Sequence, residues 1–167
     1  MSHLEHKKVS PTIVTYALIV ISDSRTEADD ESGKLYKELM GKNGHKLLSY
    51  SLLKNDSGAV RQKINDLLKL ADLQVIIASG GTGLSHRDVT VETVTPLLEK
   101  TMDGFGELFR SLSYEEIGVS SILSRAVAGV ANGKVILSLP GSLGATRLAL
   151  EKIILPEIGH IVREATR

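Results

Sequence analysis

Apolar residues along this chain follow two alternating patterns: short unbroken runs, and longer segments in which apolar positions recur every three or four residues. Thr15–Ile21 and 75–78 are runs without a charged residue, which is typical of strands buried on both faces of a sheet. Glu31–Lys42 lies between them with helical spacing, and an Asn-Gly pair follows it as a stop signal. The first half of the chain is therefore predicted to alternate between strand and helix.

The same patterns predict the remaining elements. We expect a second strand over 45–53, a helix that Ser57 caps and that runs to residue 70, and helical structure over 91–100 and 105–117. Residues 124–131 and 134–139 flank an Asn-Gly pair, which favours a two-residue hairpin.

The last turn and the fold class follow from these elements. Pro140, Gly141 and Ser142 turn the chain into a final helical region, which we expect to break near Pro156. Strands that alternate with helices predict an α/β fold, a three-layer α/β/α sandwich with a mostly parallel sheet to which the hairpin adds an antiparallel strand. We expect one domain over 12–167 and a loose polar tail over 1–11.

Four polar segments follow the predicted strands, and the carboxyl ends of parallel strands are where α/β sheets bind ligands. They are rich in Ser, Asp, Gly or Asn, and they comprise 22–25, 54–57, 79–90 and 140–142. Their convergence at one edge predicts an active site there.

The segment 79–90 is the most distinctive of the four. Gly80, Gly81, Thr82 and Gly83 form a strand-to-helix junction whose backbone can turn sharply and bring N–H groups to an anion. A tight turn without a ligand is the alternative, and the polar residues that follow favour the ligand. The segment lacks the Gly-Lys-Ser/Thr of a phosphate-binding P-loop. The first strand also lacks a dinucleotide fingerprint after it, which disfavours a nicotinamide-dependent oxidoreductase.

Asp56 and Asp88 each follow a predicted strand end. Taken alone, Asp88 would cap the next helix, with Thr90 as a rival for that role, and Asp56 would form a local turn. As a pair from neighbouring strand ends they suit Mg²⁺, which one or two carboxylates and substrate phosphates commonly hold.

Several other polar residues are candidates for ligand contacts. Glu107 lies near a helix start and would either hydrogen-bond a base or pterin ring or interact favourably with the helix dipole. Two of five cations are expected to meet phosphate oxygens; the five are Arg25, His86, Arg87, Arg125 and Arg147.

Composition narrows the class of protein. The net charge of 0 argues against a nonspecific nucleic-acid binder. The absence of Cys excludes disulfides and fits a cytoplasmic protein. No apolar run is long enough to cross a bilayer, so we expect no membrane partner.

These motifs together resemble the MoaB/MogA family of molybdenum-cofactor biosynthesis, and the MoaB branch in particular. The resemblance spans 16–165 in family order, and it rests on the motifs 79–83, 87–90, 104–107, 123–125 and 139–142. It implies molybdopterin adenylyltransferase activity, in which Mg-ATP gives its AMP to the terminal phosphate of molybdopterin and pyrophosphate is released.

The resemblance also implies roles for particular residues. Asp56 and Asp88 would serve Mg²⁺ and catalysis. The nucleotide would be surrounded by Ser22, Asp23, Gly80, Gly81, Thr82, Gly83, Pro140 and Gly141. Molybdopterin would be bound by Ser124, Arg125, Ser142 and Glu107. A homotrimer or homohexamer is expected, with a molybdenum-insertion protein as a partner.

Three residues depart from the family pattern, in which Pro is common: Asn55, Val91 and Asp103. None of them removes a proposed carboxylate. The alternative function is a non-catalytic member that binds or carries molybdopterin.

Overall fold

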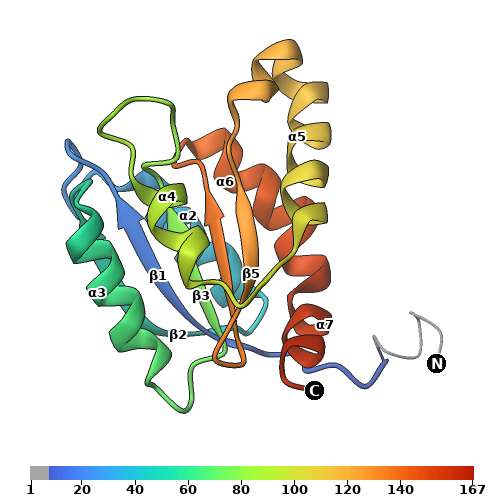
Figure 1. Ribbon diagram of the computed structural model, residues 1–167. Helices are drawn as coiled ribbons and strands as arrows, with labels where there is room; N and C mark the ends of the chain where they lie inside the picture. Colours follow the sequence, from blue (N-terminus) through green and yellow to red (C-terminus); the bar gives the residue numbers. More distant parts are fainter. Residues whose placement is uncertain (1–7) are drawn as a thin grey trace.

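The computed structural model describes residues 8–167, which form a six-stranded sheet in the order β2-β1-β3-β6-β5-β4 (Figure 1). The strands are β1 (Thr15–Ile21), β2 (Lys46–Leu53), β3 (Val75–Ser79), β4 (Lys100–Thr101), β5 (Val127–Ala131) and β6 (Lys134–Leu139). β1, β2, β3 and β6 run parallel, whereas β5 is antiparallel to β6 and β4 to β5. The predicted α/β fold with a mostly parallel sheet and an antiparallel hairpin strand is confirmed. The tail was expected over 1–11, and its residues 1–7 lie outside the described part.

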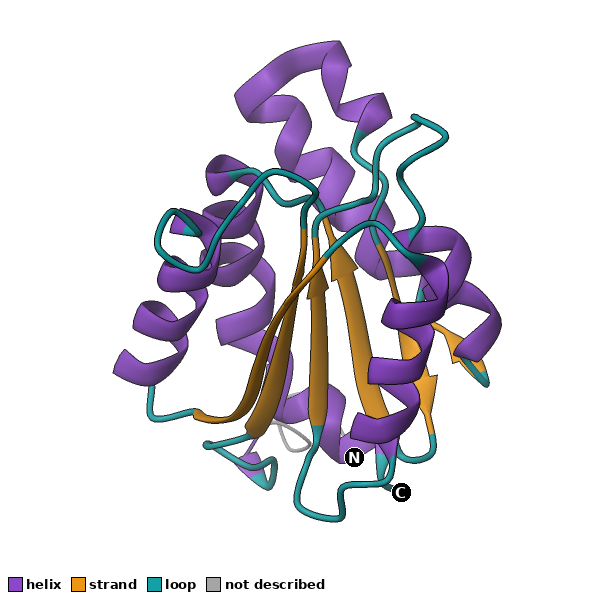
Figure 2. Ribbon diagram, turned by 90° about the vertical axis from the view of Figure 1, so that its left-hand side faces the viewer, coloured by secondary structure: helices purple, strands orange, loops and turns teal. Residues whose placement is uncertain are grey.

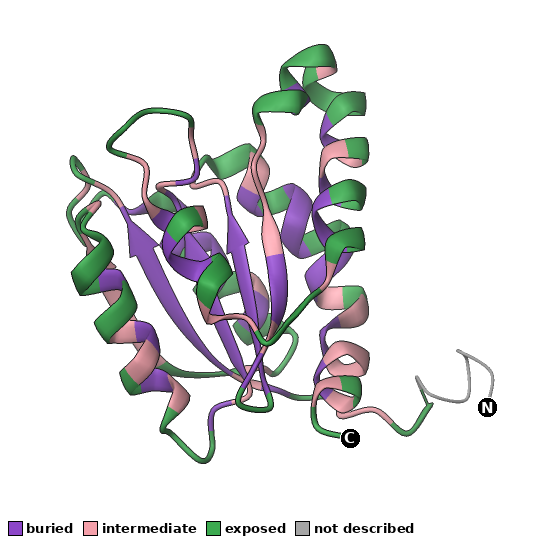
Figure 3. Ribbon diagram, viewed as in Figure 1, coloured by how far each residue is buried: buried purple, intermediate pink, exposed green. Residues whose placement is uncertain are grey.

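Helices cover both faces of the sheet (Figure 2). They are α2 (Glu31–Lys42), α3 (Ser57–Leu68), α4 (Thr90–Val94), α5 (Asp103–Ile117), α6 (Leu143–Ala149) and α7 (Leu155–Ala165), joined in part by the short turns η1 (Thr95–Leu97), η2 (Gly118–Leu123) and η3 (Leu150–Ile154). Apolar side chains of α2, α5, α6, η3 and α7 pack on one face. Those of α3 and α4 pack on the other. Figure 3 shows the buried sheet between the exposed outer surfaces of the helices.

The two cores explain why the strands read as unbroken apolar runs. Leu18 and Val20 of β1 point into the core under α2, and Ile19 and Ile21 into the core under α3. Because successive side chains alternate between faces, a strand covered on both sides needs an apolar residue at every position.

The ends of two predicted helices differ from the structure. The residue that caps α3 is Asp56 rather than Ser57, and the helix ends at Leu68 instead of residue 70. The expected helix over 91–100 is shorter: α4 and η1 end at Leu97, and Lys100 begins the short edge strand β4. Pairing of β4 with β5 overrides the local helical pattern there.

The hairpin forms at the predicted pair. Asn132 and Gly133 both have positive φ, 49° and 70°, as a two-residue turn between twisted strands requires. The preceding strand begins at Val127 rather than at residue 124, so Ser124 and Arg125 lie in a loop.

The expected break near Pro156 is wrong. The chain stays helical from α6 through η3 into α7, and Pro156 occupies the first turn of α7. The intervening η3 is a π-helical turn, a wider turn that accommodates a residue unable to donate a backbone hydrogen bond.

Candidate functional site

The four polar segments meet at one edge of the sheet, above the carboxyl ends of its parallel strands (Figure 2). Ser22 N donates to Leu53 O at 2.9 Å, which joins the ends of β1 and β2. Gly80 N donates to Leu139 O at 2.9 Å, which joins the ends of β3 and β6. The chain passes from β1 to β2 on one side and returns to β3 on the other. The edge between β1 and β3 is therefore the topological switch point at which such sheets bind ligands.

Glycine is required in the turn after β3. Gly80 and Gly81 have φ of +102° and +64°, where other residues are strained. A Cβ at Gly80 would overlap the carbonyl oxygen of Ile21, and a Cβ at Gly141 would lie 2.9 Å from Gly80 Cα. The turn thus packs directly against the ends of β1 and of the loop after β6.

Every backbone carbonyl from Gly80 to Gly83 accepts a hydrogen bond. Thr90 Oγ1 donates to Gly80 O at 2.7 Å and Thr90 N donates to Gly81 O at 2.9 Å. Arg125 donates to Thr82 O and to Gly83 O, both at 2.8 Å.

The N–H groups of the same turn are unused. Within residues 8–167 no hydrogen bond uses the N–H groups of 81–84. A trans peptide points its N–H opposite to its C=O. In four consecutive peptides, therefore, the carbonyl accepts a hydrogen bond while the N–H group makes none. Such a run of donors is an anion-binding arrangement.

The two candidate carboxylates are held by backbone groups. Asp88 Oδ2 accepts from Ser85 N at 3.1 Å, and a Cβ at Gly83 would lie 2.5 Å from this oxygen. Asp56 Oδ1 accepts from Ala59 N at 2.7 Å. The helix-cap interpretation of Asp88 is wrong, because α4 has Val89 at its N-cap position and no side-chain cap. Thr90, its rival, is the first residue of α4 and instead holds the glycine turn.

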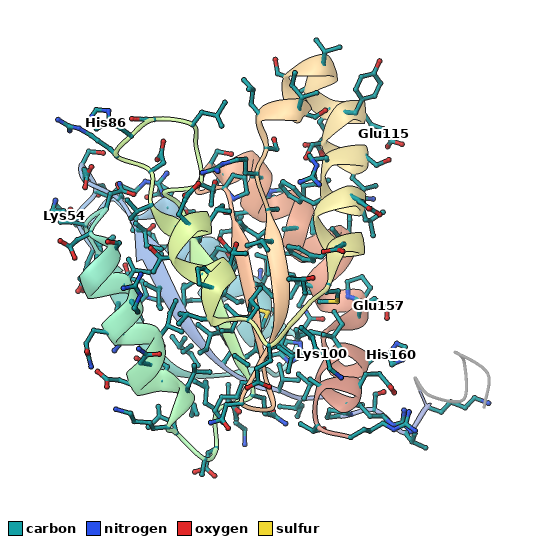
Figure 4. All side chains as sticks on the ribbon, in the orientation of Figure 1. Lys54, His86, Lys100, Glu115, Glu157 and His160 are labelled. Carbon is teal, nitrogen blue, oxygen red and sulfur yellow. The ribbon has the colours of Figure 1, made fainter. Side chains whose placement is uncertain are left out.

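Asp23 lies in the loop between these segments. Its Oδ1 accepts from Asn55 N at 2.9 Å, and its backbone carbonyl accepts from Lys54 Nζ at 2.6 Å. Hydrogen bonding from the backbone N–H and then the side chain of Asn55, followed by the charges of Arg87 and Lys54, holds the pKa of Asp23 below its ordinary value. Figure 4 shows Lys54 and His86 on neighbouring loops at this end of the molecule. Arg87 and Lys54 therefore bring positive charge to Asp23.

Arg25 ties the loop after β1 to the loop after β6. Its guanidinium donates to Gly141 O at 3.0 Å and to Ser32 Oγ at 2.6 Å, and it lies 3.7 Å from the buried carboxylate of Asp30. Asp30 caps α2 and accepts a hydrogen bond from Tyr50 at 2.7 Å. Arg25 thereby fixes the place of Gly141 relative to the loop after β1.

A cavity of about 130 Å³ lies beside the loop after β6, between α5 and α6. The predicted residues Ser124, Pro140 and Ser142 line it together with Ser113 and Glu116 of α5, and its remaining lining residues are Ile117, Gly144, Ala145 and Leu148. Sequence reasoning missed Ser113 and Glu116, because only the packing of α5 against the loop brings them to the cavity.

Two of the predicted molybdopterin-binding residues do not line this cavity. Glu107 is exposed near the start of α5, and the Arg125 side chain reaches the glycine turn instead. Of the other cations, Arg147 pairs with Glu151 at 3.1 Å on the surface.

Neither a metal-binding cluster nor a membrane-spanning helix is found among the described residues. They contain no cluster of three or more His, Cys, Asp or Glu side chains arranged to hold a metal. They also contain no helix long and apolar enough to cross a membrane.

Comparisons with known proteins agree with this architecture. A family model described as a probable molybdopterin binding domain matches residues 17–160. The chain is 49% identical to molybdenum cofactor biosynthesis protein B of Bacillus cereus, over 100% of this chain and 99% of that protein. It is 43% identical to the Bacillus subtilis protein of the same name, over 98% and 97%.

Solved structures give the same result. A crystal structure of a molybdenum cofactor biosynthesis protein B has a TM-score of 0.89 at 48% identity, over 93% of this chain and 98% of that chain. The tungsten cofactor synthesizing protein MoaB from Pyrococcus furiosus has a TM-score of 0.85 at 35% identity, over 95% and 100%. From the matched domain, the identity along the whole chain and the shared fold, the protein belongs to the MoaB/MogA family and takes part in molybdenum cofactor biosynthesis.

Proposed function

We propose that this protein is a molybdopterin adenylyltransferase that transfers AMP from Mg-ATP to the terminal phosphate of molybdopterin. The observation that carries the proposal is the glycine turn, whose four open N–H groups lie at the switch point next to Asp88. A triphosphate is the kind of ligand that such a row of donors binds. The cavity lined by Ser124 and Ser142 offers a neighbouring place for the second substrate.

The reaction asks the protein mainly for positioning and charge neutralisation. An oxygen of the molybdopterin phosphate forms a bond to the α-phosphorus of ATP. The bond from that phosphorus to the bridging oxygen breaks, and pyrophosphate leaves with the electron pair. The nucleophile is already ionised, so no general base is needed. The N–H groups of 81–84 stabilise charge on the phosphate oxygens throughout the transfer.

The residues at the edge fit a magnesium ion that is shared with substrate. Asp88 and Asp56 supply hard carboxylate oxygens, and protein sites for Mg²⁺ commonly use only one or two of these beside substrate phosphates. When bound, Mg²⁺ supplies neutralisation of the triphosphate charge. Ser22, Asp23, Pro140 and Gly141 surround the nucleotide in this arrangement.

Asp56 motivates a second candidate, a non-catalytic member that binds or carries molybdopterin. Its carboxylate already serves as the cap of α3, a purely structural task that an inactive member would also keep. This alternative predicts molybdopterin binding without AMP transfer.

The deciding experiment mixes the protein with molybdopterin, Mg²⁺ and ATP, and follows adenylylated molybdopterin and pyrophosphate. Both products are expected from the wild type. Asp88→Asn, which keeps an oxygen for the Ser85 N–H, is expected to fold and to lose transfer. Binding of molybdopterin without either product would favour the carrier, and full activity of both Asp88→Asn and Asp56→Asn would refute the metal roles.

We also propose that copies of this chain assemble as a trimer or a hexamer and that the assembly hands its product to a molybdenum-insertion protein. Large apolar side chains are exposed along the end of α5 and through η2, and they include Tyr114, Ile117, Val119, Ile122 and Leu123. A concentration of exposed apolar residues of this kind is typical of a protein interface.

A further inference from the structure

The side chain of Arg125 crosses from the loop before β5 to the glycine turn and to α4. Its Nε donates to Thr82 O at 2.8 Å and its Nη2 to Gly83 O at 2.8 Å. The same guanidinium forms a two-point pair with Glu92, with Nη1 2.5 Å from Oε1 and Nη2 3.2 Å from Oε2. One side chain therefore connects the loop before β5 to the glycine turn and to α4, which lie 33 to 43 residues earlier in the sequence.

These contacts use most of the hydrogen-bonding capacity of Arg125. A guanidinium has five N–H donors, and four contacts are made, to two carbonyls and both oxygens of one carboxylate. Glu92 also neutralises its charge. Hydrogen bonding to Arg125 holds the pKa of Glu92 below its ordinary value, as expected for a carboxylate that stays ionised in this pair.

The contacts set the direction of the N–H donors in the same peptides. Because each peptide is planar and trans, fixing the carbonyls of Thr82 and Gly83 fixes the N–H groups of Gly83 and Leu84 in the opposite direction. Thr90 does the same for the two preceding peptides. Thr90 and Glu92 both belong to α4, so this short helix supports the whole turn, directly at one end and through Arg125 at the other.

We propose that Arg125 is a positioning residue for the nucleotide phosphates, held in place by Glu92, and that it does not bind molybdopterin. It acts through the carbonyls of Thr82 and Gly83, which orient two of the four N–H donors of the phosphate-binding turn. This inference rests on the proposed function, in that the turn receives phosphate groups.

The experiment compares Arg125→Lys and Glu92→Gln with the wild type, using Glu151→Gln as a matched control. Lysine keeps the charge but not the planar array of donors that reaches two adjacent carbonyls and a carboxylate. Glu92→Gln leaves Arg125 intact and weakens only its support. Glu151 of η3 forms an i,i+4 surface pair with Arg147 at 3.1 Å, so its variant reports the loss of a surface ion pair alone.

Three readouts are taken: amide NMR signals of 81–84 without ligand, the affinity for pyrophosphate with Mg²⁺, and the affinity for molybdopterin. We expect the turn signals to shift in Arg125→Lys and Glu92→Gln but not in Glu151→Gln. Pyrophosphate affinity should fall about tenfold in Arg125→Lys, as for the loss of one charge-assisted hydrogen bond, and by a smaller factor in Glu92→Gln. Molybdopterin affinity should be unchanged in both.

Two results would overturn the inference: unchanged turn signals in Arg125→Lys, or a loss of molybdopterin affinity with pyrophosphate affinity retained. The latter would make Arg125 a direct ligand of molybdopterin. Failure of the proposed function is separate, because a wild type that binds pyrophosphate at these amides but forms no adenylylated product would leave the positioning role of Arg125 supported and the transferase proposal refuted.

Discussion

The carboxylate of Asp56 accepts a hydrogen bond from the backbone N–H of Ala59 at 2.7 Å. The contact caps α3 directly after the loop that follows β2, at the carboxyl edge of the sheet. The same residue is therefore part of a helix end and a candidate for binding magnesium, and the two roles can be separated by the choice of substitution.

Asp56→Asn should keep the cap and lose the charge. Asn and Asp are nearly equal as N-caps, whereas Ala at such a position costs about 1 kcal/mol. We expect urea unfolding to show little change for Asp56→Asn and a loss of about 1 kcal/mol for Asp56→Ala, while both lose AMP transfer. An active Asp56→Asn would limit this residue to its structural role.

Gly80→Ala should destabilise the fold, because a Cβ there would overlap the carbonyl oxygen of Ile21 at a φ of +102°. Strain of this kind costs about 1–3 kcal/mol before any clash is counted. Gly104→Ala is the matched control, since a Cβ at Gly104 meets nothing within 4 Å on the helix α5 and Ala is favoured over Gly in a helix by about 0.5–1 kcal/mol. Thermal unfolding should therefore move in opposite directions for the two variants, and equal shifts would contradict the tight packing of the turn.

Glu116→Gln should weaken molybdopterin binding more than Glu107→Gln. Glu116 lines the cavity with Ser124 and Ser142, where its carboxylate can accept hydrogen bonds from the N–H groups of a pterin ring. A single charge-assisted hydrogen bond contributes about 1.5–3 kcal/mol, so we expect an affinity loss of about tenfold or more. Titration of each variant with molybdopterin measures this affinity. A larger loss of affinity for Glu107→Gln would contradict the placement of the pterin in the cavity.

The Glu92–Arg125 pair should make a small contribution to stability that depends on pH. Hydrogen bonding to Arg125 lowers the pKa of Glu92 in the folded state. The contribution is therefore fully present above the ordinary pKa of about 4.3 and is lost as the pH falls through the lowered folded value. The Glu92 side chain is 57% exposed, so the effect is modest.

NMR titration of the Glu92 carboxyl tests this directly. Its pKa should rise toward the ordinary value in Arg125→Ala, and the stability difference between wild type and Glu92→Gln should shrink on acidification below about pH 4. A Glu92 pKa that is the same in wild type and Arg125→Ala would show that the pair does not persist in solution.

Ile122→Lys should reduce the oligomeric mass of the protein. Ile122 is 77% exposed in η2, next to other exposed apolar residues, and a buried unpaired charge at an interface opposes association. Leu70→Lys, on the α3 side of the sheet and 44% exposed, serves as a control that changes charge equally. Light scattering of the three proteins gives the masses, and an unaltered mass for Ile122→Lys would exclude this surface as the interface.

The features that were predicted from the sequence are those that depend on local interactions along the chain. β1, α2 and the Asn132–Gly133 hairpin were predicted with their bounds or nearly so, because alternation, helical spacing and turn preference are local. The gathering of four loops at one edge also followed, since parallel strands end on the same side.

What the sequence left open depends on contacts between distant segments. Asp56 rather than Ser57 caps α3, β4 replaces the end of a helix, and Glu116 reaches the cavity only because α5 packs beside the loop after β6. The direction of the Arg125 side chain belongs to the same class: its partners lie 33 to 43 residues away in the chain. The metal, nucleotide and molybdopterin roles stay predictions.

The π-helical turn between α6 and α7 changes the direction, around the helix axis, in which the buried residues of α7 point. One series of its buried residues is spaced by four over the whole length, Thr146, Leu150, Ile154, Ile158 and Val162, and Leu148, Ala149 and Ile153 are buried beside it. In a regular α-helix a step of four residues overshoots one turn by about 40°, so four such steps would carry the stripe about 160° around the axis. One extra residue corresponds to about 100° of rotation, so the residue added in η3 offsets most of this drift.

It follows that a one-residue deletion is tolerated within η3 but not within the regular helix that follows it. Removing a residue within η3, such as the exposed Glu151 or Lys152, lets the wide turn close as ordinary α-helix while the flanking segments keep their facing. Removing a residue within α7 instead rotates everything after it by about 100°, which turns Val162 to water. The π-helical turn thus sets the rotation of α7 relative to the sheet, independently of the loop that precedes α6.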